Sequence, residues 1–238
     1  MEVIIIGKII PMAELSNHIR SGMRIMIGGF LGLGQPLAIV DFMLENGIGD
    51  ITLISNDSSF VDRGLGKLIA QGRVKKLITS HIGTNIGARK LVMSGALETE
   101  IMPLGTLVER IHAGGAGLGG VLLPTGVGTL VEEGKRKLTV DGRDYLLETP
   151  IRAELALIKA SVCDRSGNIQ YTGTSRNINP VMSMAADTVI VETDALVETG
   201  NMDPSFVHTS GVLVDYIVVN DSGIPGKDKS ENRGERNG

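Results

Sequence analysis

Apolar and polar positions follow each other in blocks along the first half of the chain. Short apolar runs at 23–27, 51–55, 75–80 and 100–104 each lead into a glycine or polar loop and then into an amphipathic stretch. Apolar runs of this length without internal alternation are typical of strands buried on both faces. The pattern predicts an α/β fold, with an open, mostly parallel sheet and helices on both faces.

The amphipathic stretches between these runs predict the helices. Within 35–47, Leu37, Val40 and Leu44 fall on one helical face, and Pro36 suits the first helical turn. Three further segments are helical in composition, namely 67–72, 88–95 and 105–115.

The second half of the chain adds small β-hairpin excursions to this pattern. Asp141 and Gly142 stand between two alternating runs, which is a strong signal for a two-residue hairpin turn. The segment 163–171 predicts a second tight turn. Strand and helix patterns then return at 155–160, 179–186, 187–193 and 214–219.

The last part of the sequence differs from the rest in composition. Residues 220–238 carry four basic and four acidic side chains and hardly an apolar group. Such a segment cannot bury enough apolar surface to fold. We therefore predict one domain over residues 1–219 and a charged, disordered tail over 220–238.

Composition and charge exclude several classes of protein. The net charge is −4, aromatic residues make up 3%, and no basic run occurs, so we expect no nucleic-acid partner. No run approaches the roughly 18 apolar residues of a membrane span, and the start lacks the features of a signal peptide. The single cysteine, Cys163, cannot form an internal disulfide. We expect a cytoplasmic protein with no membrane partner.

A glycine-rich loop is the first candidate for chemistry. The stretch "IMIGGFLGLGQP" (25–36) passes from an apolar run through four glycines to a helix start. In open α/β sheets, ligands bind beyond the carboxyl ends of strands, where such a loop points N–H groups at them. A tight turn without a ligand explains the pattern equally well. A second glycine cluster at 114–120 follows a predicted helix instead of a strand, which argues against a dinucleotide site.

Other catalytic signatures are weak. The four histidines are scattered, none forms a ligand pair at helical spacing, and we expect no metal site. Asn56 and Asp57 end the second predicted strand, so their side chains could face the crevice that the glycine loop borders. The alternative is a local Asx turn. We favour the site, because two such loops would converge at one edge of the sheet.

Beyond these local signals, the sequence resembles a known family. The stretch "SGMRIMIGGFLGLGQP" (21–36) is similar to the signature of class I coenzyme A transferase alpha subunits. The resemblance continues in order through 61–85, 105–135, 144–160 and 175–192. Several independent motifs over about 220 residues are far more specific than any single glycine pattern.

The resemblance implies both an activity and a division of labour. Such enzymes move CoA from a short-chain acyl-CoA, of the acetate, butyrate or acetoacetate class, to a free carboxylic acid. They act through a glutamyl-CoA thioester formed on a beta subunit, so no catalytic residue is expected in this chain. CoA is a substrate, and no tightly bound cofactor is implied. The implied assembly is α2β2 with the beta subunit.

The resemblance also implies positions for the site. Asn56 and Asp57 correspond to the active-site rim. The implied CoA-binding residues are Gly28, Gly29, Phe30, Leu31, Gly32, Leu33 and Gly34.

Two departures from the family pattern and one misleading match stand out. Ser21 replaces the usual Asp or Asn before the first glycine, and Leu104 replaces a glutamine, which bears on acyl preference. Glu231 lies in a near copy of the family's Ser-Glu-Asn-Gly nucleophile motif, but a disordered tail offers no rigid, desolvated position. Two alternatives remain open at this point, a sugar-phosphate isomerase of similar architecture and a non-catalytic acyl-CoA-binding protein.

Overall fold

A computed structural model describes residues 7–220 of the chain. The predicted tail lies outside the described residues except for Asn220, and so does the motif around Glu231. Within residues 7–220, no helix is both long and apolar enough to cross a membrane.

The core of the fold is a seven-stranded sheet in the order β13-β11-β8-β1-β2-β3-β4, and every neighbouring pair is parallel. This confirms the predicted fold class. The strands are β1 (Arg24–Ile27), β2 (Ile51–Asp57), β3 (Val74–His81), β4 (Glu98–Ile101), β8 (Ala153–Ala160), β11 (Ala186–Thr193) and β13 (Tyr216–Val219).

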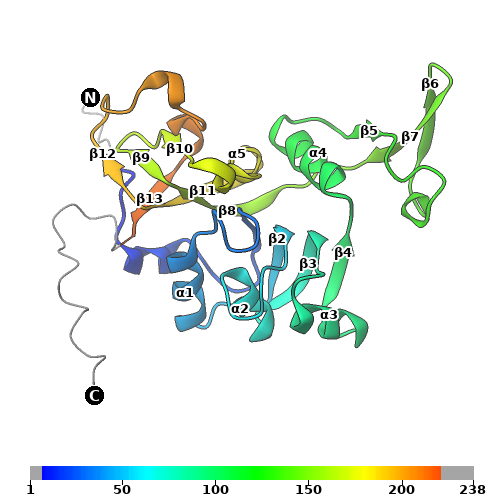
Figure 1. The fold of residues 1–238 in the computed structure, drawn as a ribbon, viewed down its shortest axis with the longest axis horizontal. Coiled ribbons are helices and arrows are strands. Elements are labelled where there is room, and N and C mark those ends of the chain that lie inside the picture. The colour runs from blue at the N-terminus through cyan, green and yellow to red at the C-terminus, as the bar shows by residue number, and fades with distance from the viewer. Residues whose placement is uncertain (1–6, 221–238) are drawn as a thin grey trace.

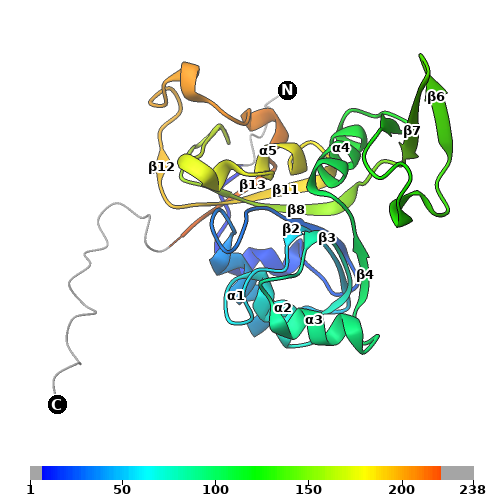
Figure 2. The same ribbon diagram turned by 45° about the vertical axis from the view of Figure 1, so that its right-hand side comes forward.

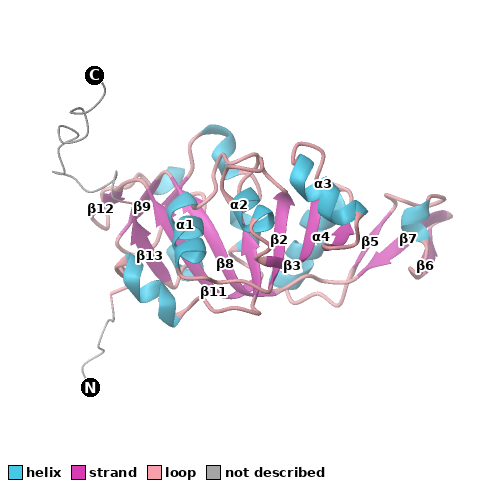
Figure 3. Cartoon of the chain, turned by 90° about the horizontal axis from the view of Figure 1, so that it is seen from below, coloured by secondary structure: helices cyan, strands magenta, loops and turns pink. Residues whose placement is uncertain are grey.

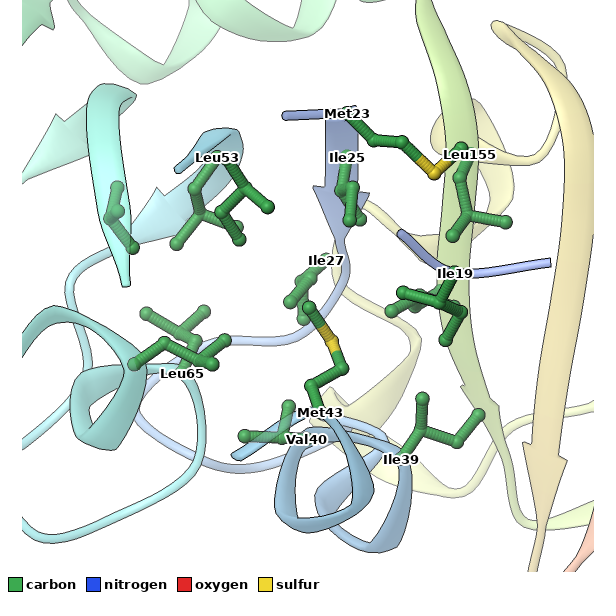
Figure 4. Close-up of a cluster of buried hydrophobic side chains, with 14 of the residues drawn as sticks. Ile19, Met23, Ile25, Ile27, Ile39, Val40, Met43, Leu53, Leu65 and Leu155 are labelled. Atoms are coloured by element: carbon green, nitrogen blue, oxygen red, sulfur yellow. The ribbon is translucent and has the colours of Figure 1, made fainter. Parts of the chain in front are cut away.

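Side chains alternate between two hydrophobic clusters, one on each face of the sheet. In β1, Ile25 and Ile27 join the first cluster, whereas Met26 joins the second. Figure 4 shows part of the first cluster, where Met43 and Val40 of a helix lie against these strand residues. Because both faces are buried at the centre of the sheet, strands such as β1 and β8 are mostly apolar, whereas the edge strand β4 is largely polar.

Helices cover both faces of the sheet (Figure 1). Three of them pack on the first face, namely α1 (Leu37–Glu45), α2 (Leu65–Ala70) and α3 (Ile86–Met93). On the other face lie α4 (Leu104–Gly115) and α5 (Asn179–Met182). The strand order runs outward from β1 in both directions, and right-handed crossovers then place the two helix sets on opposite faces.

The predicted buried face of α1 is partly wrong. Val40 is buried as predicted, but its partners are Ile39 and Met43, whereas Leu37 and Leu44 are only half-buried. Leu37 instead borders a pocket beside the glycine loop. Pro36 precedes the helix as its N-cap and does not lie in the first turn.

Two other predicted segments are shorter than expected. The strand placed at 100–104 ends at Ile101, because Pro103 lacks an N–H for a strand ladder and α4 begins at Leu104. The helix placed at 179–186 ends at Met182, and the chain is already extended from Ala186. Residues 183–185 form the turn between α5 and β11, and Ala186 already pairs with Ala153 of β8.

Residues 121–148 form an arm that projects from the main body (Figures 1 and 2). Its sheet has the order β5-β7-β6 and is antiparallel, with β5 (Val121–Leu123), β6 (Lys137–Val140) and β7 (Arg143–Glu148). Asp141 and Gly142 join β6 to β7, which confirms the predicted hairpin. Figure 3 shows the arm at one end of the elongated molecule.

The second predicted turn is also confirmed. It joins the antiparallel strands β9 (Val162–Asp164) and β10 (Ile169–Gln170), and β12 (Leu196–Val197) completes this small sheet. The short 3₁₀ helices are η1 (Met12–Asn17), η2 (Leu130–Glu132), η3 (Gly173–Arg176), η4 (Pro204–Phe206) and η5 (Gly211–Leu213).

Candidate functional site

The glycine loop leaves β1 at the point where the strand order reverses. The neighbours of β1 are β2 on one side and β8 on the other, and this is the switch point at which open α/β sheets bind ligands. Phe30 and Leu33 exchange two backbone hydrogen bonds of 2.9 Å each around Leu31 and Gly32. Both central residues have positive φ, 49° and 85°, as a type I′ turn requires. The loop is therefore a tight hairpin turn standing on the carboxyl edge of the sheet.

Position 28 has no room for a side chain, because Asn179 of the same chain fills the space beside it. A methyl group there would lie 1.7 Å from Asn179 Oδ1, and Asn179 is fully buried at the start of α5. The Asn179 amide donates to the carbonyls of Gly34, at 3.1 Å, and of Ser175, at 2.9 Å. One asparagine side chain thus occupies the space beside the start of the loop and binds its end.

Asn56, at the end of β2, lies between two other elements. Its Oδ1 accepts a hydrogen bond of 2.8 Å from Ser80 Oγ on β3, and its Nδ2 donates to Asn177 Oδ1 at 3.2 Å. Asn177 has φ 35°, a left-handed conformation that is uncommon for residues other than glycine. Asn56 is only 2% exposed, so in this chain it lies beneath the site surface.

Asp57 ends β2 one residue later and is fully buried. Its Oδ2 accepts hydrogen bonds from the backbone N–H of Leu31, at 3.1 Å, and of Ser59, at 2.9 Å. Burial raises the pKa of this carboxyl above its ordinary value, and the two N–H donors and the nearby His81 only partly oppose that effect. The predicted convergence of the two loops is therefore a direct contact from Asp57 to Leu31.

An ion-pair network with one buried and one exposed carboxylate lies across from the glycine loop. Lys159 Nζ, at the end of β8, contacts Glu192 Oε1 at 2.9 Å and Asp194 Oδ1 at 2.5 Å. Glu192 is fully buried, and its Oε2 accepts a hydrogen bond of 3.0 Å from the N–H of Ile39 in the first turn of α1. The carboxylate thus satisfies a free N–H at a positive helix end.

A pocket of about 230 Å³ separates this network from the glycine loop. Gly32, Leu33 and Gly34 line one side, and Lys159, Glu192 and Asp194 line the other. Two carboxylates beside one ammonium group leave the far wall with a net negative charge. That charge would repel phosphate groups, whereas neutral hydrogen-bonding groups fit it.

Sequence reasoning missed Asn179 and the Lys159 network. A signal for the network was present, because Lys159 and Glu192 are charged residues near the carboxyl ends of otherwise apolar strands. Asn179 gave no comparable signal, since its contacts with the glycine loop span 145 residues of sequence. Leu104, which the sequence comparison singled out as a departure from the expected pattern, opens α4 and is 42% exposed.

Comparison with known proteins gives consistent results. Residues 10–220 match the model of the coenzyme A transferase family. The chain is 51% identical over 212 residues to the acetate CoA-transferase alpha subunit of Escherichia coli K12, covering 89% of this chain and 96% of that protein. It is 50% identical over 212 residues to the acetoacetyl-CoA:acetate/butyrate CoA transferase alpha subunit of Clostridium acetobutylicum, covering 89% of this chain and 97% of that one.

Solved structures support the fold. Glutaconate coenzyme A-transferase from Acidaminococcus fermentans aligns with a TM-score of 0.79 at 22% identity, covering 89% of this chain and 75% of that one. An acyl-CoA transferase from Escherichia coli O157:H7 aligns with a TM-score of 0.78 at 20% identity, covering 90% and 47% of the two chains. Given the family match over residues 10–220 and these close relatives, the chain belongs to the coenzyme A transferase family.

Proposed function

We propose that this chain is the alpha subunit of a CoA-transferase that moves CoA between short-chain acids of the acetate, butyrate and acetoacetate class. The observation that carries the proposal is about 50% identity, over nearly the whole length of both chains, to two alpha subunits whose names specify these acids. Family membership leaves the isomerase and carrier alternatives without support.

In this proposal the glycine loop, residues 28–34, contacts CoA. Within residues 7–220, no hydrogen bond uses the N–H groups of Gly32 or Gly34, and both residues line the pocket, so these groups can donate to a ligand there. Phe30 and Leu33 are 38% and 54% exposed and offer apolar contact at the same loop. The negative wall formed by Glu192 and Asp194 favours the neutral amides of the pantetheine arm over the phosphates.

The nucleophile in this proposal is a glutamate of the beta subunit. Its carboxylate attacks the thioester carbonyl, CoA leaves as the thiolate, and an acyl-glutamyl anhydride forms. The thiolate then attacks the glutamyl carbonyl and releases the first acid, which leaves a glutamyl-CoA thioester for the second acid to attack. The buried glutamates of the described chain suit this role poorly, because Glu148 is paired with Lys135 and Glu192 with Lys159.

A trapping experiment tests the division of labour. The chain is co-expressed with a candidate beta subunit that carries a Ser-Glu-Asn-Gly motif, and the complex is incubated with acetyl-CoA and treated with borohydride. Mass spectrometry is expected to find the reduced glutamate on the beta subunit. A beta subunit with that glutamate changed to glutamine is the matched control. A reduced glutamate on the chain described here would overturn the proposal, and so would CoA transfer by this chain alone.

The same preparation tests the assembly. We propose an α2β2 complex, and light scattering of the purified complex measures its mass directly. An active assembly built from this chain without a second type of subunit would contradict the proposed stoichiometry. It would also contradict the proposal that the beta subunit supplies the nucleophilic glutamate.

A further inference from the structure

One carboxylate oxygen holds two strained backbone positions at the candidate site. Leu31, at φ 49°, and Ser59, at φ 55°, are both non-glycine residues in the left-handed region. The N–H groups of both donate to Oδ2 of Asp57, at 3.1 Å and 2.9 Å. Leu31 belongs to the glycine loop after β1, and Ser59 belongs to the loop after β2. Asp57 therefore joins two loops that reach this edge of the sheet from neighbouring strands.

These hydrogen bonds oppose the cost of the backbone conformation. A left-handed conformation is unfavourable for a residue that carries a Cβ atom. A hydrogen bond from a backbone N–H to a buried carboxyl oxygen is favourable, because leaving either group without a partner is costly. The two hydrogen bonds to Asp57 thus hold Leu31 and Ser59 in conformations that neither residue prefers. Without them, a leucine at the first central position of a type I′ turn has no local reason to stay there.

The two loops also meet at the next residue of the turn. A methyl group at Gly32 would lie 2.5 Å from Nε of Arg63, so the side chain of Arg63, in the loop after β2, lies against the turn. Asp57 is fully buried, and its Oδ1 has no hydrogen-bond partner within the described residues. Asp57 is also not among the residues that line the pocket beside the loop.

We infer that Asp57 is a positioning residue that locks the glycine loop in the shape that binds CoA without touching CoA itself. This inference rests on the proposed function of the loop. It assigns to Asp57 a role different from that of Asn56, although the two residues are adjacent. By holding the N–H of Leu31, Asp57 fixes which way the free N–H groups of Gly32 and Gly34 point.

Steady-state kinetics of the assembled enzyme test the role. With acetyl-CoA as the varied substrate and butyrate as the acceptor, Asp57→Ala is expected to raise KM for acetyl-CoA about tenfold, while kcat changes less. Leu31→Gly, which accepts positive φ without strain, is expected to restore much of the KM when combined with Asp57→Ala. Asp187→Ala is the matched control, since Asp187 is an exposed carboxylate near the amino end of β11.

A second measurement on the full chain does not depend on turnover. Hydrogen–deuterium exchange of the peptide spanning 26–36 is expected to rise in Asp57→Ala, while the strands β3 and β8 keep their protection. If exchange and KM both stay at wild-type values in Asp57→Ala, the inference is overturned. A uniform rise of exchange over the whole sheet would overturn it too, because Asp57 would then be a general stabilising residue. If the wild-type complex shows no CoA transfer, the proposed function is contradicted. Hydrogen–deuterium exchange of the peptide 26–36 in Asp57→Ala then still tests whether Asp57 positions the loop.

Discussion

Two turns of this protein share one backbone conformation but reach it by different means. Leu31 and Gly32 in the glycine loop have φ 49° and 85°, and Asp141 and Gly142 in the arm have φ 48° and 74°. The Asp-Gly pair is the residue choice that such a turn favours, and it is exposed in the arm. The leucine is an unfavourable choice.

The difference shows where each conformation is specified. In the arm, local sequence is sufficient, because aspartate and glycine both tolerate positive φ. In the glycine loop, long-range contacts from Asp57 and Asn179 impose the conformation. A turn held by tertiary contacts can be shaped for a ligand instead of for its own stability, which is typical of functional sites.

The largest expected effect comes from filling the space beside the glycine loop. Gly28→Ala is expected to destabilise the chain by about 2–3 kcal/mol, because the new methyl group overlaps buried Asn179. Urea unfolding measures the change. In an Asn179→Ala background the same substitution should cost clearly less, and equal costs in both backgrounds would show that the overlap is not the cause.

Gly142→Ala is the matched control for that measurement. No heavy atom lies within 4 Å of the position of its methyl group, so only the backbone strain remains, at roughly 1 kcal/mol. A loss as large as that of Gly28→Ala would remove the distinction between the two turns.

The next effect comes from placing leucine in the arm turn. Asp141→Leu creates the pair that the glycine loop carries, but without a carboxylate to hold it. It is expected to destabilise the hairpin by about 1 kcal/mol, seen as faster hydrogen exchange in β6 and β7. Unchanged exchange would mean that leucine needs no tertiary support in such a turn, which would weaken the role given to Asp57.

The reverse substitution gives a smaller effect of opposite sign. Leu31→Asn places a residue that tolerates positive φ at the first central position of the glycine loop. It is expected to raise the free energy of unfolding by about 0.5–1 kcal/mol, measured in urea. Destabilisation instead would indicate that the half-buried leucine side chain contributes more through packing than its backbone conformation costs.

The smallest effect concerns pH. The pKa of Asp57 is raised, chiefly by burial, so the folded chain keeps a proton that the unfolded chain has already released. Stability therefore falls as pH rises from the ordinary value, about 4, through the folded value. Asp57→Asn lacks this dependence, so the unfolding free energy of the wild type relative to the variant should decline over that window.

Urea unfolding from pH 4 to pH 7 measures that difference. The charge of the His81 imidazole lowers the pKa of Asp57. His81→Gln removes that charge, so the pKa of Asp57 should rise further and the decline in stability should extend to higher pH. A relative stability of the wild type that increases with pH would contradict the assigned direction.

The strands and the hairpin turns were predictable because their signals are local. Apolar runs placed β2, β3 and β8 within two residues of their observed ends. The buried face of α1 was not predictable in full, because Ile39, Val40 and Leu37 are all apolar. Which of them faces the sheet depends on how the preceding loop positions and rotates the start of the helix.

For the site, the sequence located the parts but not their connections. It placed the glycine loop, Asn56 and Asp57 at strand ends, and the structure brings Asp57 into contact with that loop. It gave no signal for Asn179, since a buried asparagine in a helix start looks like an ordinary polar residue. The pairing of Lys159 with Glu192 needed strand order, which places β8 beside β11.

By itself, the sequence determined the parallel α/β sheet, the Asp141-Gly142 hairpin and the family resemblance that the comparisons confirmed. These follow from periodicity and from short motifs, which act within a few residues. Only the tertiary structure decided the shape of the glycine loop. A leucine adopts a left-handed conformation there because Asp57, 26 residues away in the sequence, accepts its N–H at the end of a neighbouring strand.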